Sequence, residues 1–250
     1  MALTVPQTIE CFHLAFLQVL ATRLDQRAYV LKGGANLRYF FDSVRYSEDI
    51  DLDVAGIDGW ALAEKVAGVL ESPAMSILLR TARLSVSEYI KPKQSDTTQR
   101  WKVAIAAAER SDPVRTKIEF SRRNGETRFV LEPVPARVVE PYAMRAPTLQ
   151  HYQADAAGEQ KVAALAGRSQ TQARDVFDLD LLLRLRPVTR GAIPSAVLEQ
   201  AAERALDLPY AAFRDQVLAF LDPEIIDLYE GADAWQQMQS QVVQKLLEAR

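Results

Sequence analysis

Residues that bind metals through sulfur or imidazole are scarce in this sequence. Cys11 is the only cysteine, and His13 and His151 are the only histidines, among 250 residues. A single cysteine allows neither an internal disulfide nor a cysteine-based zinc site, and it fits a reducing compartment. The two histidines lie far apart, and neither has a His or Cys at the spacing of metal ligands. We therefore expect both histidines to be structural or on the surface.

Long apolar runs are also missing. Charged residues interrupt every apolar stretch before the roughly 18 residues that a membrane helix needs. No positively charged segment precedes the first apolar stretch, as it would in a signal peptide. Hydrophobic residues make up 48% of the chain and charged residues 25%, a balance typical of soluble globular proteins. We expect a cytoplasmic protein with no membrane partner, built as one large domain or two joined ones.

Net positive charge is absent from both ends of the chain and gathers in the middle. The formal net charge is -3, but residues 80–145 hold 14 lysines and arginines against 8 aspartates and glutamates. Such a basic segment can attract phosphates and so bind RNA. A charged, solvated face of a sheet explains the same composition, so the sequence leaves both interpretations open.

Hydrophobic periodicity predicts an α+β protein with helices and strands mixed in its first half. An amphipathic helix opens the chain, and we expect further helices at 33–43 and 59–72, the latter capped by Asp58 and ended by Pro73. Strands are expected at 28–31, 49–54, 77–79, 83–90, 101–108 and 115–121. The aromatic residues expected in the core are Tyr39, Phe40, Phe41, Trp60, Trp101 and Trp235.

The second half has the pattern of a helical bundle. Residues 133–150 contain four prolines and predict an extended connector. Helical periodicity follows at 156–169, 173–185, 196–206, 210–221 and 233–249. We therefore predict two domains, residues 1–145 with a mixed sheet and residues 146–250 with a C-terminal helical bundle.

Three aspartates alternate with apolar residues in the predicted strand at 49–54. Side chains in a strand alternate between faces, so Asp49, Asp51 and Asp53 share one face. Crowded carboxylates repel each other, and their pKa values rise unless a cation or basic side chains lie among them. Carboxylate oxygens in such a row suit Mg2+ or Mn2+. The alternative is an exposed edge strand with acidic decoration.

The pair Gly33 and Gly34 follows a predicted apolar strand and precedes a predicted helix. Without Cβ atoms, such a turn lets backbone N–H groups approach an anion, and the helix N-terminus adds positive potential. Glycine pairs are common in tight turns, but here the carboxylate row is on the next strand in sequence. A phosphate-binding turn beside metal-binding carboxylates is what metal-assisted phosphoryl or nucleotidyl transfer requires.

A further carboxylate is expected from a neighbouring strand. Glu119 is the best candidate, because alternation places it on one face of its strand with Lys117 and Ser121. It would act as a general base or a metal ligand. The alternative is an exposed glutamate paired with Lys117 or Arg115.

The chain resembles the AbiEii-type nucleotidyltransferases, the toxins of abortive-infection, type IV toxin–antitoxin systems. The stretch LKGGANLR followed by RYSEDIDLD at 31–53 is similar to one signature of that family, and EQKVAALAGRSQTQARDVFDLDLLL at 159–183 is similar to another. The two together are far more specific than either alone. The resemblance implies a nucleotidyltransferase-like fold for residues 1–145, which would form the catalytic domain.

The resemblance also implies roles for individual residues. It assigns the metal to Asp49 and Asp51 with Glu119 as the third carboxylate, and Asp53 would support them. The residues that it implies in nucleotide binding are Lys32, Gly33, Gly34, Arg45, Ser47, Lys161, Arg174 and Asp175. For Arg45 and Ser47, capping and pairing with carboxylates are equally good explanations.

The second signature has its own physical interpretation. On a helix, Arg174 and Asp178 share a face suited to an ion pair. Lys161, on the preceding helix, would reach the triphosphate while Asp175 or Asp178 positions it. Lys161 and Asp178 are therefore counted with the catalytic residues. The alternative is ordinary salt bridging between helices.

One position departs from the family pattern. Many relatives have a threonine after the glycine pair, whereas this chain has Ala35 followed by Asn36. A hydroxyl contact to phosphate is therefore missing, which puts the nucleotide preference in doubt more than catalysis. Asn36 either replaces that contact or does not.

The expected function is transfer of a nucleoside monophosphate from an NTP to a hydroxyl of RNA, such as a tRNA 3′ end, with Mg2+ or Mn2+. The resemblance further implies a toxin that a cognate antitoxin counters. Two alternatives remain: a nucleotidyltransferase that modifies a small molecule such as an antibiotic, and a catalytically idle nucleotide-binding or scaffold protein.

Overall fold

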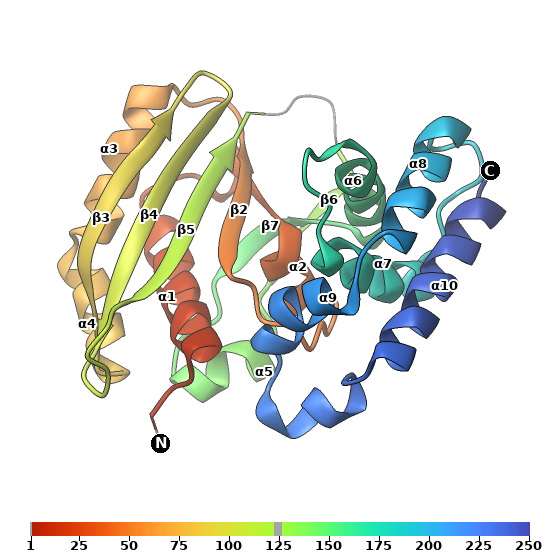
Figure 1. Ribbon diagram of the computed structural model, residues 1–250. Helices are drawn as coiled ribbons and strands as arrows, with labels where there is room; N and C mark the ends of the chain where they lie inside the picture. Colours follow the sequence, from red (N-terminus) through yellow and green to blue (C-terminus); the bar gives the residue numbers. More distant parts are fainter. Residues whose placement is uncertain (1, 123–126) are drawn as a thin grey trace. The chain divides into compact units, whose positions relative to one another are not determined.

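The computed structural model describes residues 2–122 and 127–250, which divide into two compact units. The first unit comprises Met1–Asp42 and Tyr46–Tyr152, and the second comprises Ser43–Arg45 and Gln153–Arg250. The predicted α+β class, a mixed sheet with helices followed by C-terminal helices, is confirmed (Figure 1). The boundary between a catalytic and a helical domain at residues 145 and 146 stays a prediction, because compact units are defined by contacts and not by function.

A seven-stranded sheet forms the centre of the first unit. Its strand order is β3-β4-β5-β2-β1-β7-β6. The pairs β2/β5 and β1/β7 are parallel, and the remaining neighbours are antiparallel. The strands are β1 (Tyr29–Lys32), β2 (Asp49–Val54), β3 (Leu84–Gln94), β4 (Thr98–Ala107), β5 (Val114–Ser121), β6 (Phe129–Pro133) and β7 (Thr148–Tyr152).

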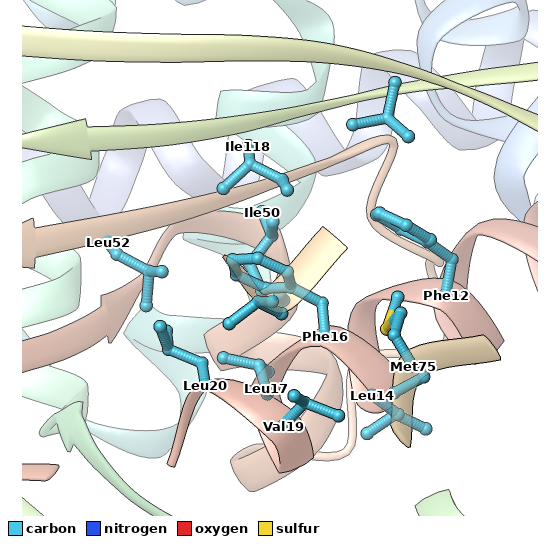
Figure 2. Packing of buried hydrophobic residues seen from close by; sticks show 14 of the residues in the cluster. Phe12, Leu14, Phe16, Leu17, Val19, Leu20, Ile50, Leu52, Met75 and Ile118 are labelled. Carbon is cyan, nitrogen blue, oxygen red and sulfur yellow. The ribbon is translucent and has the colours of Figure 1, made fainter. Parts of the chain in front are cut away.

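Helix α1 (Val5–Leu20) forms the core together with one face of this sheet. Thr4 starts it with a capping box to Gln7, which satisfies two of the N–H groups that a helix start leaves open. Figure 2 shows Phe16 of α1 directed at Ile50 of β2, with Ile118 of β5 nearby. The other helices of this unit are α2 (Gly33–Phe40), α3 (Gly59–Leu70), α4 (Pro73–Thr81), α5 (Ala136–Val139) and the 3-10 helices η1 (Gln26–Ala28) and η2 (Glu140–Tyr142).

Two local predictions in this unit are wrong. Residues 77–79, expected as a strand, lie in α4, because the Ser72 side chain caps that helix and Pro73 occupies its first turn, where proline is tolerated. Trp60, expected in the core, is 73% exposed at the start of α3, whereas Trp101 is fully buried. A proline at a helix start therefore begins a second helix here.

The proline-rich connector is also more ordered than predicted. Residues 133–150 contain α5, η2 and most of β7, which pairs with both β1 and β6. Pro135 precedes α5 as its N-cap residue. His151 consequently lies in a strand of the sheet, where it is buried.

The second unit is helical around a core of its own. Phe213 stacks on Trp235 at a ring-centroid distance of 4.6 Å, and both are buried. Its helices are α6 (Ala154–Gly167), α7 (Ala173–Leu185), α8 (Ser195–Leu206), α9 (Tyr210–Gln216), α10 (Ala232–Glu248) and the 3-10 helices η3 (Leu218–Phe220) and η4 (Pro223–Leu228). Among the described residues of the whole chain, no helix combines the length and the apolar character needed to cross a membrane.

Candidate active site

Strand β2 presents its three aspartates on the face of the sheet opposite to the α1 core. Ile50 and Leu52, which alternate with them, are fully buried on the core side. In the register of the sheet, Asp51 lies between Lys32 of β1 and Glu119 of β5. Residues paired across adjacent strands share a face, so the structure brings carboxylates of two strands together beside the turn after β1.

Basic and hydroxyl side chains separate these carboxylates. Lys32 forms an ion pair with Asp53, whose other oxygen accepts a hydrogen bond of 2.8 Å from the Tyr152 hydroxyl. The Lys117 ammonium lies 2.8 Å from Asp49. Asp49 and Asp53 are thus each held by a lysine of a neighbouring strand.

Asp51 differs from its two neighbours. Among the described residues, no hydrogen bond or ion pair reaches its carboxylate. It lies against Gly33, where a Cβ atom would come within 2.9 Å of Asp51 Oδ2. Gly33 also has a φ of 70°, which residues with a side chain rarely adopt. Glycine is therefore required at this position for its conformation and for the approach of the carboxylate.

The Gly33–Gly34 pair opens helix α2 directly after β1. Lys32 is the N-cap residue, and its side chain makes no capping hydrogen bond. The first N–H groups of a helix without such a cap are available to an anion. The predicted phosphate-binding turn thus adjoins an unpartnered carboxylate, which is the geometry for a phosphate and a metal ion side by side.

The charge on the row is not fully balanced. Burial raises the pKa of the Asp49 carboxyl above its usual value, Lys117 opposes this effect, and the nearby Asp51 and Glu48 carboxylates raise it further. A carboxyl in this condition gains from an additional cation. This observation fits a divalent cation at Asp49 and Asp51.

Glu119 is oriented by an arginine that the sequence did not single out. Arg100 of β4 donates from Nε at 2.7 Å and from Nη2 at 2.6 Å to Glu119 Oε2. Lys117 is 4.0 Å from the same oxygen, whereas Arg115 pairs at 3.8 Å with Glu88. Finding Arg100 requires the pairing of β4 with β5, which no local pattern reveals.

A metal ion would be held here by two carboxylates. Within the residues that the structure describes, no three or more His, Cys, Asp or Glu side chains converge on a metal site. Mg2+ in nucleotide-dependent enzymes is commonly bound by one or two carboxylates together with substrate phosphates. Asp49 and Asp51 fit this arrangement. A ligand role for Glu119 stays a prediction.

Ser47 and Asn36, both near this face in sequence, serve the backbone. The Ser47 hydroxyl donates at 2.7 Å to the main-chain oxygen of Asp49. Asn36 is fully buried; its amide donates to the Tyr152 carbonyl at 3.0 Å, and its Oδ1 lies 3.0 Å from His151 Nδ1. Because both groups of the Asn36 amide are used inside the fold, this side chain does not replace the hydroxyl missing at Ala35.

The remaining predicted residues belong to the second unit, where they form a buried charge cluster. Lys161 of α6 lies 3.0 Å from Asp175 and 2.6 Å from Asp178 of α7. Arg45 donates from Nη2 to both oxygens of Asp178 at 3.0 Å. Asp175 and Asp178 are fully buried. Two carboxylates and two cations thus neutralise each other inside the helical unit.

The cluster keeps Asp178 ionised. Burial alone would raise the pKa of its carboxyl, but Arg45 and Lys161 hold that pKa below its usual value. Arg168, another residue that the sequence did not single out, lies 3.4 Å from Asp175. Arg174 is half-buried on α7. Lys161 has three N–H donors, and contacts to two carboxylates leave one of them over.

A glycine turn that opens a helix against an aspartate row of a mixed sheet defines the nucleotidyltransferase class. The family model described as "Nucleotidyl transferase AbiEii toxin, Type IV TA system" matches residues 15–249. The chain therefore belongs to the AbiEii family, and the resemblance found in the sequence is confirmed. Membership makes it a nucleotidyltransferase of the toxin class, with an NTP substrate and a cognate antitoxin.

Two solved structures have a similar fold. JHP933 from Helicobacter pylori superposes with a TM-score of 0.62 at 17% sequence identity, covering 99% of this chain and 94% of that one. A candidate nucleotidyltransferase from H. pylori gives a TM-score of 0.59 at 18% identity, covering 95% of this chain and 92% of that one. At these identities the likeness concerns the fold alone. No curated protein matches the sequence.

Proposed function

We propose that this protein transfers a nucleoside monophosphate from an NTP to a hydroxyl group of RNA, with tRNA as the preferred acceptor, in the cytoplasm. We further propose that the reaction depends on Mg2+ or Mn2+ held by Asp49 and Asp51. One observation carries this proposal: the unpartnered Asp51 carboxylate lies against Gly33 at the start of α2.

In the proposed reaction, the acceptor hydroxyl oxygen forms a bond to the α-phosphorus and the bond to the β-phosphate breaks. Pyrophosphate leaves, and the Glu119 carboxylate, oriented by Arg100, accepts the hydroxyl proton. The N–H groups of Gly33 and Gly34 bind phosphate oxygens. A divalent cation bound at Asp49 and Asp51 would neutralise phosphate charge and align the reacting groups.

Lys32, Ser47 and Asp53 support this arrangement. Lys32 and the Tyr152 hydroxyl hold Asp53 on either side, which fixes the end of β2 beside the turn. Ser47 bonds the main chain at Asp49 and so fixes the start of the same strand. When a nucleotide occupies the turn, the Lys32 ammonium offers its charge to a phosphate.

The charge cluster of the second unit completes the proposed nucleotide site. Lys161 uses two of its donors on Asp175 and Asp178 and gives the third to a phosphate oxygen. Asp178 acts as a positioning residue, because Arg45 and Lys161 occupy its oxygens. Arg174 is assigned to nucleotide binding as well.

RNA is proposed as the acceptor because the basic excess of the chain falls in residues 80–145, which include β4 and β5 of the active-site sheet. Cations beside a reaction site attract a polyphosphate chain. A small hydroxyl-bearing acceptor would gain little from them.

The proposal is tested by incubating the purified protein with Mg2+, total cellular RNA and each NTP labelled at its α-phosphate. We expect label on RNA with the wild type and with Asp96→Asn, a matched change on an exposed turn, but not with Asp51→Asn. Label on small molecules alone would replace the RNA proposal by the antibiotic-type alternative. An absence of label on any product would favour the catalytically idle alternative.

A further inference from the structure

The face of the sheet that carries the aspartates continues over β5, β4 and β3. Lys117 of β5 is paired with Asp49 on one side and with Lys102 of β4 on the other, and Lys102 is paired with Ile90 of β3. Paired residues of neighbouring strands share a face. These side chains therefore form one surface that begins at Asp49 and ends at the edge strand β3.

A cavity of about 310 Å³ opens on this surface directly beside Asp49. Its size lies at the lower end of the range found for small-ligand pockets, about 300 to 1,000 Å³. Ile90, Val103 and Ala104 give it an apolar part, and Lys102 and Arg115 lie at its edges. An apolar floor with cations around it suits a nucleotide, whose base and sugar need contact area and whose phosphate needs positive charge.

The side chains here are open to solvent. Ile90 is 56% exposed, and Lys102 is exposed with no ion pair or hydrogen bond among the described residues. The Arg115–Glu88 pair is long, at 3.8 Å, with both side chains mostly exposed, so it is weak. Lys102 and Arg115 are accordingly available to a ligand.

Positive charge extends beyond the cavity. Arg100 lies two residues from Lys102 on the same strand and face, about 7 Å away, and Lys93 of β3 is paired with Arg100. Lys93 is exposed. The cations of this surface on β3 to β5 are Lys93, Arg100, Lys102, Arg115 and Lys117, against the acids Glu88 and Glu119. A small acceptor would need only the cavity, whereas a stripe of cations that runs past it suits a chain of phosphates.

We propose that this surface binds the acceptor RNA, with the terminal nucleotide in the cavity beside Asp49 and the preceding phosphates on Lys102, Arg115 and Lys93. The terminal base and sugar lie on Ile90, and the terminal hydroxyl faces the metal-binding carboxylates. This inference rests on the proposed function and names the site at which its RNA acceptor binds.

The test measures binding of a short single-stranded RNA with a free 3′ hydroxyl and a 5′ fluorescein, by fluorescence anisotropy. Lys102→Glu/Arg115→Glu is compared with Arg27→Glu/Arg80→Glu, which changes the net charge equally at exposed positions elsewhere in the first unit. We expect the first variant to bind about tenfold more weakly and the salt dependence of its affinity to fall by about 0.7 per lost phosphate contact. The control variant keeps the wild-type affinity. Equal affinities of both variants would overturn the proposal.

A second measurement separates this surface from the proposed chemistry. Binding of a fluorescent NTP with Mg2+ should be unchanged in Lys102→Glu/Arg115→Glu, and the KM for RNA in the labelling reaction should rise while the KM for NTP stays constant. Selective loss of RNA affinity without label transfer by the wild type would contradict the proposed function and support the surface. Label transfer with an unchanged KM for RNA would do the reverse.

Ile90→Ala provides an independent variant that leaves all charges in place. It should weaken RNA binding without changing the salt dependence, since an apolar contact is lost and no phosphate contact is. A wild-type affinity of Ile90→Ala would overturn the assignment of the cavity to the terminal nucleotide. Unchanged far-ultraviolet circular dichroism and melting temperature verify that each variant is folded.

Discussion

At the scale of single residues, Gly33 shows most clearly how the sequence specifies the site. Its φ of 70° and its closeness to Asp51 both require the absence of a Cβ atom. Gly56 has the same φ, but nothing lies within 4 Å of the position that its Cβ would take. The two glycines therefore separate backbone strain from the steric demand of the site.

Gly33→Ala should lower nucleotidyl transfer, whereas Gly56→Ala should not. Both variants should lose about 1 to 3 kcal/mol of unfolding free energy, because alanine is strained in the left-handed region. Only Gly33→Ala pushes the Asp51 carboxylate away, and a displacement of that kind lowers activity by about tenfold or more. Urea unfolding and the labelling assay measure the two effects. Equal activities of the variants would show that Gly33 is needed for the fold alone.

His13 predicts a pH dependence of stability. Thr116 donates its hydroxyl hydrogen to the Glu48 carbonyl, so its oxygen accepts a 2.8 Å hydrogen bond from His13 Nε2–H. Burial lowers the pKa of His13 from 6.5 to about 3. The unfolded chain therefore binds the proton more readily, and the stability that neutral His13 provides is present above about pH 6.5 and is lost as the pH falls towards 3.

The expected result is a loss of about 2 kcal/mol of unfolding free energy by the wild type between about pH 7 and about pH 5, relative to His13→Gln. The variant retains a side chain that can bond Thr116 but has no proton to gain. Comparing the two chains removes the contributions of all other titrating groups. Parallel pH profiles of the two proteins in urea unfolding would contradict the assignment of a depressed pKa.

At the scale of elements, what could be predicted depends on how local its cause is. Strand β2 and the turn at Gly33 follow from alternation and from adjacent glycines, and both were predicted. The Arg100 partner of Glu119 depends on the register between β4 and β5, and β7 depends on pairing with β1 and β6. Such contacts between distant segments leave no periodic signal. The helix at residues 77–79 was missed because its start is set by Ser72 and Pro73.

Helices α6 and α7 are joined by the buried charges of Lys161 and Asp178. Asp178→Asn should lower the unfolding free energy by about 3 kcal/mol or more, because Lys161 and Arg45 lose their buried counter-charge. Glu199→Gln breaks an exposed pair with Arg250 in the same unit and should cost about 1 kcal/mol or less. Urea unfolding of the two variants provides the comparison. Equal small losses would mean that the cluster adds little to the packing of α6 on α7.

At the scale of the whole molecule, the two sequence signatures do not divide cleanly between the two units. Ser43–Arg45 lies between the Gly33 turn and β2 in the sequence, yet it belongs to the helical unit. There Arg45 pairs with Asp178, and Val44 packs against the helical core. This accounts for the long spacing between Gly34 and Asp49. The family match across residues 15–249 fits a chain whose units share segments.

Membership of a toxin family predicts an effect on growth. Induced expression of the wild type in a bacterial host should slow growth, and co-expression of the cognate antitoxin should restore it. Asp51→Asn should be harmless, while Asp96→Asn should be as harmful as the wild type. Growth curves at equal protein levels, verified by immunoblotting, measure the effect. An inhibitory Asp51→Asn variant would show that growth arrest does not need the proposed chemistry.

The central claim is that Asp49 and Asp51 hold a divalent cation beside the Gly33 turn. Its most direct test is Mn2+ binding, followed by electron paramagnetic resonance in the presence of a non-hydrolysable NTP analogue. We predict that the wild type and Asp96→Asn bind Mn2+ with the same affinity and that Asp51→Asn binds it about tenfold or more weakly. Equal Mn2+ affinities of all three proteins would contradict the claim.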